Sequence, residues 1–265
     1  MISKDYFFWQ HEDLPKKART HVIFFLLLIL LVLAILAYGP LSTIIIRVFS
    51  LGIYKRGLRN KGICLTFDDG PHPVYTPQLL DLLKKYDIKA VFFVVGELAK
   101  RYPALIRRMR DEGHEIGIHH YRHVSSWMLL PHQLKKEIQE CSKIIEIITN
   151  KEPVYYRPPW GHFNLFTLLL SRGYNKILWS SISGDWKIQK ENDLIKKITG
   201  SASDGTIILL HDNGDTKGAD PEAPAVMLKA LNQSIPLLKQ QGFRFLPLNS
   251  LINGNKGTAG IKNEH

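Results

Sequence analysis

Cysteine is scarce in this chain of 265 residues, which contains only Cys64 and Cys141. Two cysteines are too few for a disulfide framework, and they lack the spacing of a cysteine zinc site. Each lies in an apolar or helical pattern, so we expect both to be small buried residues. Internal repeats, low-complexity linkers and nucleic-acid-binding motifs are also absent from the sequence. The length suits one large domain plus an appendage, and the sequence gives no indication of a nucleic-acid partner.

Acidic residues are in the minority, with 24 Asp and Glu against 35 Lys and Arg, which gives a formal charge of +11. Residues 1–61 hold nine of the basic and three of the acidic residues, so more than half of the excess flanks one apolar segment. This placement favours a membrane surface as the anionic neighbour. A merely solvated basic surface is the alternative.

Charge is missing altogether from the 25 residues between Val22 and Ile46. A helix of that length would reach about 37 Å, enough to cross a hydrocarbon core of about 30 Å. We therefore predict a short polar segment over residues 1–21 and one transmembrane anchor over residues 22–46, with a kink near Gly39-Pro40. A cleaved signal peptide is the alternative, although the run is long and no clear cleavage site follows it. Basic residues flank both ends, so the positive-inside rule does not orient the anchor.

Beyond the anchor, strand-like apolar runs alternate with helical patterns. The expected strands are 62–67, 90–95, 115–119, 154–156, 176–180, 206–210 and 243–246, and the expected helices are 76–86, 97–112, 131–149, 164–171 and 223–241. This alternation predicts an α/β fold whose parallel sheet is closed, or nearly closed, into a barrel. We expect the catalytic domain over residues 60–250 and a flexible tail over residues 251–265.

Polar residues that could bind a metal or transfer a proton follow several of these strands. Two of them, Asp68 and Asp69, come directly after the first strand, in Thr66-Phe67-Asp68-Asp69-Gly70. The others follow later strands: His119, His123, Arg157, Asp185 and His211. Alone, an Asp-Asp-Gly sequence is more often a turn than a site. In a barrel, however, the loops at the C-terminal ends of the strands converge on one face, so we expect these residues to lie together.

The spacing of His119 and His123 suits a metal site. If the chain turns helically after the third strand, residues four apart place both imidazoles on one side. With one carboxylate they would provide three ligands and leave a position for water, which is typical of a catalytic zinc site. His120 is an alternative ligand, and His114 is close by in the sequence.

Over about residues 60–250 the chain resembles the polysaccharide deacetylases, the NodB-like enzymes of carbohydrate esterase family 4. Five ordered motifs support the resemblance: Thr66-Phe67-Asp68-Asp69-Gly70, His119-x-x-x-His123, Arg157-Pro158-Pro159-Trp160-Gly161, Asp185-Trp186 and Leu209-Leu210-His211. The resemblance implies a distorted (β/α) barrel. It also implies a metal-dependent hydrolase that removes N-acetyl groups from a sugar polymer such as chitin or peptidoglycan.

The resemblance also assigns roles at the predicted metal site. Asp68 matches the general base, which must be a second, unligated carboxylate because a metal ligand loses basicity. The metal ligands would be Asp69, His119 and His123, and the expected ion is divalent, most simply Zn²⁺. Arg157 matches the arginine that pairs with the base.

The remaining assignments concern the leaving group and the substrate pocket. His211 matches the general acid that protonates the leaving amine, and Asp185 is expected to raise its pKa. The backbone N–H of Trp160 would stabilise the tetrahedral oxyanion. Trp186 and Leu209 would form a small apolar pocket for the acetyl methyl group.

Three positions depart from the family pattern. His120 stands where the family usually has Ser or Thr, Val124 replaces a common Pro, and Trp160 replaces the usual Tyr. None of the three changes removes a catalytic group. They therefore bear on the choice of substrate rather than on the reaction.

The predicted enzyme acts on an N-acetylated glycan, with its catalytic domain outside the cytoplasmic membrane. A deacylase of a lipid-linked sugar, held by the anchor at the membrane surface, is the first alternative. A non-catalytic glycan-binding module is the second, but it would be expected to lack one of the metal ligands or proton-transfer groups, and none is missing. The sequence does not indicate an oligomeric state.

Overall fold

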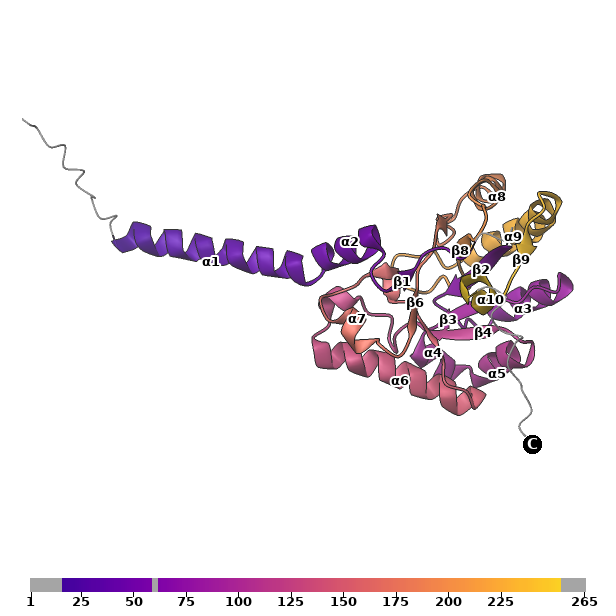
Figure 1. The fold of residues 1–265 in the computed structure, drawn as a ribbon, viewed down its shortest axis with the longest axis horizontal. Coiled ribbons are helices and arrows are strands. Elements are labelled where there is room, and N and C mark those ends of the chain that lie inside the picture. Colours follow the sequence, from indigo (N-terminus) through magenta and orange to yellow (C-terminus); the bar gives the residue numbers. More distant parts are fainter. Residues whose placement is uncertain (1–15, 59–61, 254–265) are drawn as a thin grey trace, which may run out of the picture.

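The computed structural model of the protein describes residues 16–58 and 62–253 and has an α/β fold (Figure 1). Its strands are β1 (Ile53–Tyr54), β2 (Gly62–Asp68), β3 (Val91–Val94), β4 (Glu115–Ile118), β5 (Tyr155–Tyr156), β6 (Asn175–Ile177), β7 (Ser181–Ile182), β8 (Ile207–His211) and β9 (Arg244–Phe245). Its α-helices are α1 (Lys16–Tyr38), α2 (Pro40–Phe49), α3 (Tyr75–Lys85), α4 (Gly96–Arg101), α5 (Pro103–Asp111), α6 (Pro131–Thr149), α7 (Thr167–Leu170), α8 (Glu191–Gly200), α9 (Ala223–Gln240) and α10 (Leu248–Asn253). The described chain also contains two 3₁₀ turns, η1 (Ser126–Met128) and η2 (Pro159–Gly161).

In the described part of the chain, nine strands form one parallel sheet. Eight of them follow the order β1-β6-β5-β4-β3-β2-β8-β7, and β9 pairs with the start of β2. An isolated bridge joins Arg56, just past β1, to Thr206, just before β8, so the first strand returns toward the far side of the sheet. The result is a curled parallel sheet in the form of a half-barrel, and the predicted distorted barrel is confirmed.

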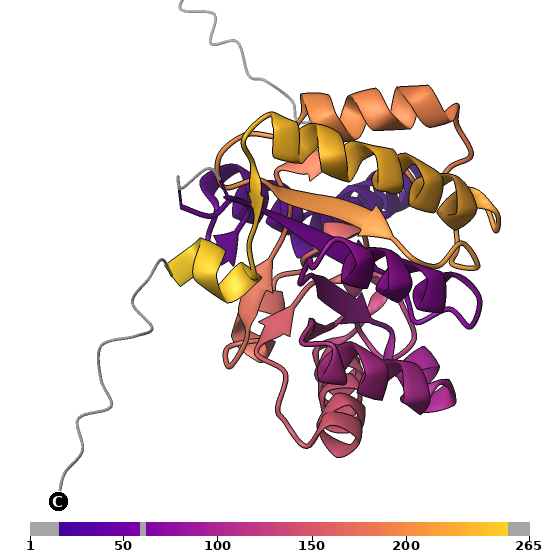
Figure 2. The ribbon, with the colours of Figure 1, turned by 90° about the vertical axis from the view of Figure 1, so that its right-hand side faces the viewer.

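The core lies between this sheet and the helices that cover its outer side (Figure 2). Every residue of β2 is buried, because the strand has neighbours on both sides, α10 packs against it, and its apolar side chains share one hydrophobic cluster with those of α3 and α9. Phe67 of β2 stacks on Phe92 of β3, with ring centroids 5.4 Å apart. Burying a side chain of this size stabilises a fold by about 1.5–3 kcal/mol, so β2 is a rigid base for the residues at its C-terminal end.

Several predicted boundaries are wrong, each for a local reason. The expected helix over 97–112 is two helices, α4 and α5, because Pro103 begins a new helix after Tyr102 leaves the helical conformation. The expected strand over 176–180 ends at Ile177, and β7 follows separately. Helix α8 and strand β1 were not predicted, and the expected helix over 164–171 is regular only in α7. Of the expected tail, Leu251 to Asn253 belong to α10, and the remainder lies outside the described residues.

The N-terminal apolar segment forms two helices that meet at Gly39. Helix α1 projects away from the domain, whereas α2 lies against it (Figure 1). The break falls at the predicted Gly39-Pro40 position, where Pro40 begins α2. Within the described residues, one stretch, Lys17–Phe49, is long and apolar enough to cross a membrane. A signal sequence has the same features, so a transmembrane anchor remains a proposal.

Candidate active site

The ends of β2 and β8 place Asp68 beside His211. In the parallel pairing of these strands, Asp68 is the register partner of His211, and both residues are the last of their strands. Parallel strands open their C-terminal ends on one edge of a sheet, which is where α/β barrels have their active sites. Asp69 follows in a left-handed conformation, with φ of 76°, and begins the turn out of the strand.

Asp69, His119 and His123 converge into a group that could hold a metal ion. One oxygen of Asp69, Oδ1, lies 3.2 Å from Nε2 of His119 and 2.9 Å from Nε2 of His123. The three candidate ligand atoms all lie within 4.8 Å of one another. Burial raises the pKa of the Asp69 carboxyl, but the two histidines outweigh burial and hold that pKa well below its usual range. The group therefore offers one carboxylate and two imidazoles, a donor set that suits zinc.

The two histidines are brought together by a loop, not by the predicted helical turn. His120 and His123 have φ of 61° and 53°, so the chain takes two left-handed steps between β4 and η1. Nδ1 of His119 lies 2.7 Å from the carbonyl oxygen of Arg157. Donation from Nδ1 to that carbonyl fixes the orientation of the ring. Nε2 then carries no proton, and its lone pair faces Asp69, as in many metal-binding histidines.

His120 and His114 are not placed as metal ligands. Both ring nitrogens of His120 are used within the protein, by the carbonyl of Val124 at 2.8 Å and the hydroxyl of Tyr156 at 2.7 Å. Burial lowers the pKa of His120 to about 3, so its ring is neutral. His114 is buried against the edge of Phe92, outside the group of three.

Arg157 and Asp68 form a buried ion pair. One guanidinium nitrogen, Nη1, donates to Oδ1 of Asp68 at 2.6 Å and to the hydroxyl of Thr66 at 2.9 Å. Nε donates to the carbonyl of Ile177 and Nη2 to the carbonyl of Leu178, so each of the three guanidinium nitrogens has a hydrogen-bond acceptor. Since one oxygen of Asp68 is held by Arg157, the other, Oδ2, is left 3.8 Å from Nε2 of His119.

Asp185 contacts His211 twice. Its Oδ1 lies 3.1 Å from Nδ1 of the imidazole, and its Oδ2 accepts the backbone N–H of His211 at 2.7 Å. Burial alone would lower the pKa of His211, but Asp185, followed by Asp69 and Asp68, raises it to about 9. The imidazole is therefore charged at neutral pH and could donate a proton through Nε2.

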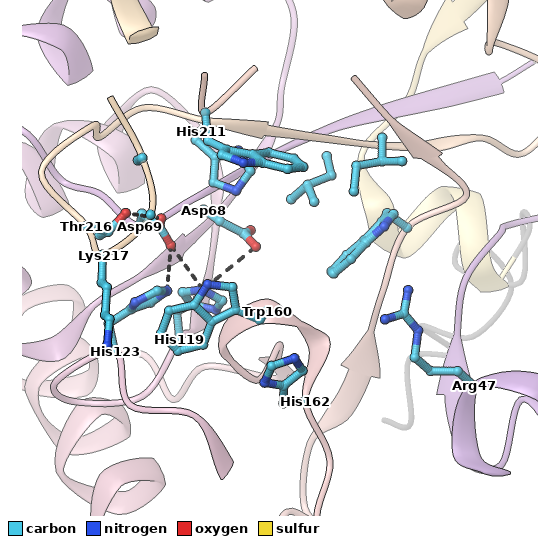
Figure 3. Close-up of a pocket in the computed structure, with 16 residues that line it drawn as sticks. Arg47, Asp68, Asp69, His119, His123, Trp160, His162, His211, Thr216 and Lys217 are labelled. Carbon is cyan, nitrogen blue, oxygen red and sulfur yellow. Dashed lines mark hydrogen bonds and ion pairs between the residues drawn. The ribbon is translucent and has the colours of Figure 1, made fainter. Parts of the chain in front are cut away.

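These groups open into a cavity of about 340 Å³. In Figure 3 Asp68, Asp69, His119 and His123 converge at one end of the cavity, and Arg47 lies at the other. Three residues that the sequence analysis assigned to substrate contact line this cavity: Trp160, Trp186 and Leu209. Trp160 is 40% exposed, and its ring lies 4.4 Å from the His123 ring, centroid to centroid, so this indole forms part of the entrance.

Known proteins share both the fold and the sequence. The sequence profile of the family described as "Polysaccharide deacetylase" matches residues 55–175. A peptidoglycan-N-acetylglucosamine deacetylase of Bacillus cereus is 36% identical over 196 residues, which cover 72% of this chain and 88% of the relative. The chain belongs to the polysaccharide deacetylase family. The predicted enzyme class, a hydrolase that deacetylates glycans, is thereby confirmed.

Other members agree with this assignment. The peptidoglycan-N-acetylmuramic acid deacetylase PdaA of Bacillus subtilis is 34% identical over 213 residues, which cover 75% of this polysaccharide deacetylase and 74% of PdaA. A crystal structure of a peptidoglycan N-acetylglucosamine deacetylase with a bound naphthyl-N-hydroxybenzamide superposes with a TM-score of 0.72 at 30% identity, over 80% of this chain and 97% of that one. A family pseudoenzyme from Bacillus anthracis superposes with a TM-score of 0.67 at 27% identity, over 74% and 67%.

Two residues of this polysaccharide deacetylase that support the metal group were not predicted. The hydroxyl of Thr216 donates to Oδ2 of Asp69 at 2.7 Å, and the amide of Asn213 donates to its backbone carbonyl at 3.0 Å. Asn213 could have been suspected, because it follows His211 by two residues. Thr216 lies in a loop with no strand-end signal, and only the folded chain places it next to Asp69.

Further lining residues were also missed, among them Arg47, Trp179, His162 and Lys217. Trp179 follows the end of β6, a position that could have suggested a role. Arg47 belongs to α2, immediately after the segment interpreted as an anchor. Nothing in its sequence neighbourhood indicates that it returns to the catalytic face.

Proposed function

We propose that this polysaccharide deacetylase hydrolyses the N-acetyl group of an N-acetylated glycan, using Asp68 as general base and His211 as general acid beside a divalent metal. The observation that supports this best is the register of β2 and β8. It sets the two proton-transfer groups side by side, with Asp69, His119 and His123 adjacent.

The metal ligands are proposed to be Asp69, His119 and His123. Their donor atoms lie close enough together to bind one ion, and Thr216 and the Arg157 carbonyl hold two of the three ligands in place. When bound, a divalent cation, most simply Zn²⁺, supplies Lewis-acid polarisation of the amide carbonyl and lowers the pKa of water. Polysaccharide deacetylases of carbohydrate esterase family 4 are metal-dependent.

Asp68 is proposed to take the proton of the attacking water. Arg157 holds one oxygen of this carboxylate and keeps it oriented, so the other is available to accept the proton. As the water oxygen bonds to the acetyl carbon, the carbonyl oxygen gains negative charge. The backbone N–H of Trp160 is the proposed donor to that oxygen, on a turn where the chain is left-handed, with φ of 55°.

His211 is proposed to give its proton to the sugar nitrogen as the C–N bond breaks, so the products are acetate and the free amino sugar. Asp185 keeps His211 protonated and turns Nε2 toward the cavity. Trp186 packs edge-on against the His211 ring, with centroids 5.4 Å apart. Together with Leu209, this indole would exclude water around the acetyl methyl group.

The substrate is proposed to be a cell-wall glycan, because relatives named for peptidoglycan deacetylation match most of the chain. Helix α1 is the proposed membrane anchor, with the catalytic domain outside the cytoplasmic membrane. The α2 helix supports a membrane location, since Ile44, Val48 and Phe49 are each more than half exposed. Apolar side chains on one face of a short helix suit the membrane interface.

A deacylase of a lipid-linked sugar is the second candidate. One observation favours it: Arg47, in the helix that follows the proposed anchor, lines the same cavity as the metal group. A non-catalytic module is a weaker candidate, because none of the proposed metal ligands and proton-transfer residues is missing from the chain. The family nevertheless contains a pseudoenzyme, so turnover has to be measured.

Acetate release from purified wall glycan, chitin oligosaccharides and a lipid-linked N-acetylated saccharide tests the proposal. We expect turnover of at least one substrate, loss of turnover with a chelator, and recovery when Zn²⁺ is restored. Turnover that persists in the chelator, with no metal bound, would contradict the metal mechanism. No acetate from any substrate, by a folded and metal-loaded protein, would favour the non-catalytic module.

A further inference from the structure

Helix α2 is fixed to the catalytic domain by Thr43. Its hydroxyl donates to the carbonyl of Phe163 at 2.7 Å and accepts from the backbone N–H of Phe163 and the indole N–H of Trp127, each at 2.8 Å. Gly39 at the start of the helix packs against the same indole, and there is no room for a side chain there. Helix α2 is therefore part of the domain wall rather than a loose connection.

Arg47 lies one helical turn after Thr43 and lines the cavity. Its guanidinium carbon lies 5.3 Å from the centre of the Trp179 ring, and the same ring lies 5.6 Å from the guanidinium of Arg157. Trp179 is held in place by close packing against Gly161. One indole thus connects Arg47 with the residue that binds the proposed base.

The charge of Arg47 has no anionic partner among the described residues. No carboxylate of the described chain lies within 4.0 Å of it, although arginines that are partly buried are usually paired. His162, its neighbour in the cavity, stacks on Trp127 at 3.8 Å. Burial, followed by the charge of Arg47, lowers the pKa of His162, so this imidazole is neutral. The positive charge at this end of the cavity is therefore that of Arg47.

We propose that Arg47 binds an anionic group, a phosphate or a carboxylate, on the saccharide whose acetyl group lies at the metal. The proposal rests on the deacetylase function above and names its substrate class as an acidic glycan. A planar guanidinium suits bidentate contact with either anion. The anion could be the diphosphate of a lipid-linked saccharide or the carboxylate of an acidic sugar in the wall polymer.

The test compares Arg47→Gln with Arg172→Gln in the full chain, held in phosphatidylcholine nanodiscs. Arg172 is exposed beyond α7 and does not line the cavity, so its loss removes one charge without touching the site. The substrates are a lipid-linked N-acetylated saccharide with a diphosphate, a soluble oligosaccharide with an acidic N-acetylated sugar, and a neutral chitin oligosaccharide.

We expect Arg47→Gln to raise KM about 10- to 100-fold for one or both anionic substrates, the loss typical of a charged hydrogen bond. The value of kcat, and KM for the chitin oligosaccharide, should stay unchanged, as should every value for Arg172→Gln. Whichever anionic substrate is affected identifies the source of the anion. Arg47→Lys keeps the positive charge but cannot bind an anion through two parallel N–H groups. A KM for this variant between those of the wild type and Arg47→Gln would support the proposal further.

Equal losses on neutral and anionic substrates would overturn the proposal and assign Arg47 to the packing of α2. An unchanged KM for both anionic substrates would overturn it as well. If the wild type releases no acetate from any substrate, the deacetylase function fails, and calorimetric binding still tests Arg47. In that case the anionic saccharides should bind at least 10-fold more weakly to Arg47→Gln than to the wild type, and equal binding would overturn the inference.

Discussion

The two ends of the cavity differ in how their charges are paired. At the metal end, which comprises Asp68, Asp69, His119, His123 and His211, every carboxylate faces an arginine or a histidine. At the anchor end, which comprises Arg47, Trp179 and His162, a single cation faces aromatic rings and, within the described chain, no carboxylate. The carboxylates of the metal end are each held by a cation or an imidazole, which suits metal binding and proton transfer, whereas Arg47 has no carboxylate partner in the described chain, which suits the binding of an anionic ligand. Substitutions at the metal end should therefore abolish turnover, and substitutions at the anchor end should change which substrates bind.

The largest effects are expected from the two neighbouring carboxylates. Asp68→Asn should lower kcat about 10²- to 10⁴-fold, because the proton acceptor is lost, while metal content stays near that of the wild type. The amide oxygen of Asn can still accept from Arg157, so the fold should be kept. Asp69→Ala, His119→Ala and His123→Ala should each lose metal together with turnover. Metal analysis and acetate release on the same four proteins provide the measurement.

The opposite pattern would exchange the two roles. Should Asp68→Asn lose its metal while Asp69→Ala retains it, Asp68 is the ligand and Asp69 the base. If all four proteins keep their metal, the ion is bound by other residues, and the proposed ligand set is wrong.

A smaller effect is expected from Asp185→Asn, and it should depend on pH. A general acid works while it is protonated, so activity should fall as the pH rises through the pKa of His211, about 9 without a metal. A cation bound to Asp69 would offset the part of the His211 pKa shift that this carboxylate causes. The basic limb of the pH profile, where activity falls, would then lie at or below pH 9. Without the Asp185 charge the limb should move to lower pH, and above the limb each unit of that shift lowers the protonated fraction of His211 about tenfold.

The pH dependence of kcat from pH 5 to 10 measures that shift. Asp193→Asn, an exposed carboxylate on α8, is the matched control and should leave the profile unchanged. A basic limb that does not move in Asp185→Asn would show that His211 does not depend on this partner.

A modest effect is expected from Thr43→Val, which tests whether the anchor end depends on the position of α2. Valine has a similar shape but leaves the Phe163 and Trp127 groups without partners, at a cost of about 1–3 kcal/mol. KM for the anionic substrate of Arg47 should rise a few-fold, and turnover of chitin oligosaccharide should not change. Thr199→Val on α8, whose hydroxyl bonds within its own helix, is the control. A loss of turnover on neutral substrate would mean that the two ends are not separable.

The smallest effect on activity is expected from His120→Phe. His120 bonds to Val124 and Tyr156 instead of facing the metal end, so its loss should lower stability by about 1–3 kcal/mol and leave metal content unchanged. Thermal unfolding and metal analysis of the folded variant provide the measurement. A protein that unfolds normally but binds no metal would make His120 a ligand after all.

Much of the metal end could be predicted because strands carry it. Asp68 and His211 each end a short apolar run, and the sheet order brings such ends together. The loop geometry could not be predicted, because the φ values of His120 and His123 depend on the contacts of the folded loop rather than on local preference. Helix α8 was missed although Leu194, Ile195 and Ile198 follow a helical spacing, so that signal was present in the sequence.

The anchor end could not be predicted from the sequence. Arg47 lies next to a long apolar segment, where a basic residue is ordinarily taken for a membrane-flanking charge. Its role depends on where α2 packs, and that position is set by contacts between Thr43 and residues more than 80 positions later in the chain. Contacts over such separations leave no periodic signal in a single sequence.

The junction at Gly39 has a consequence for how such an enzyme would search for substrate. A single residue separates α1 from α2. The catalytic domain holds both Tyr38 and Thr43 by hydrogen bonds, so the connection between α1 and the cavity is short and rigid. If α1 spans the bilayer, the cavity keeps a constant height and tilt above it, unlike a domain on a flexible tether. Glycan strands farther out in the wall would stay out of reach. The enzyme would reach its substrates by lateral diffusion in the membrane. Its rate of deacetylation would then depend on the number of acetylated sugars per unit area of the membrane surface.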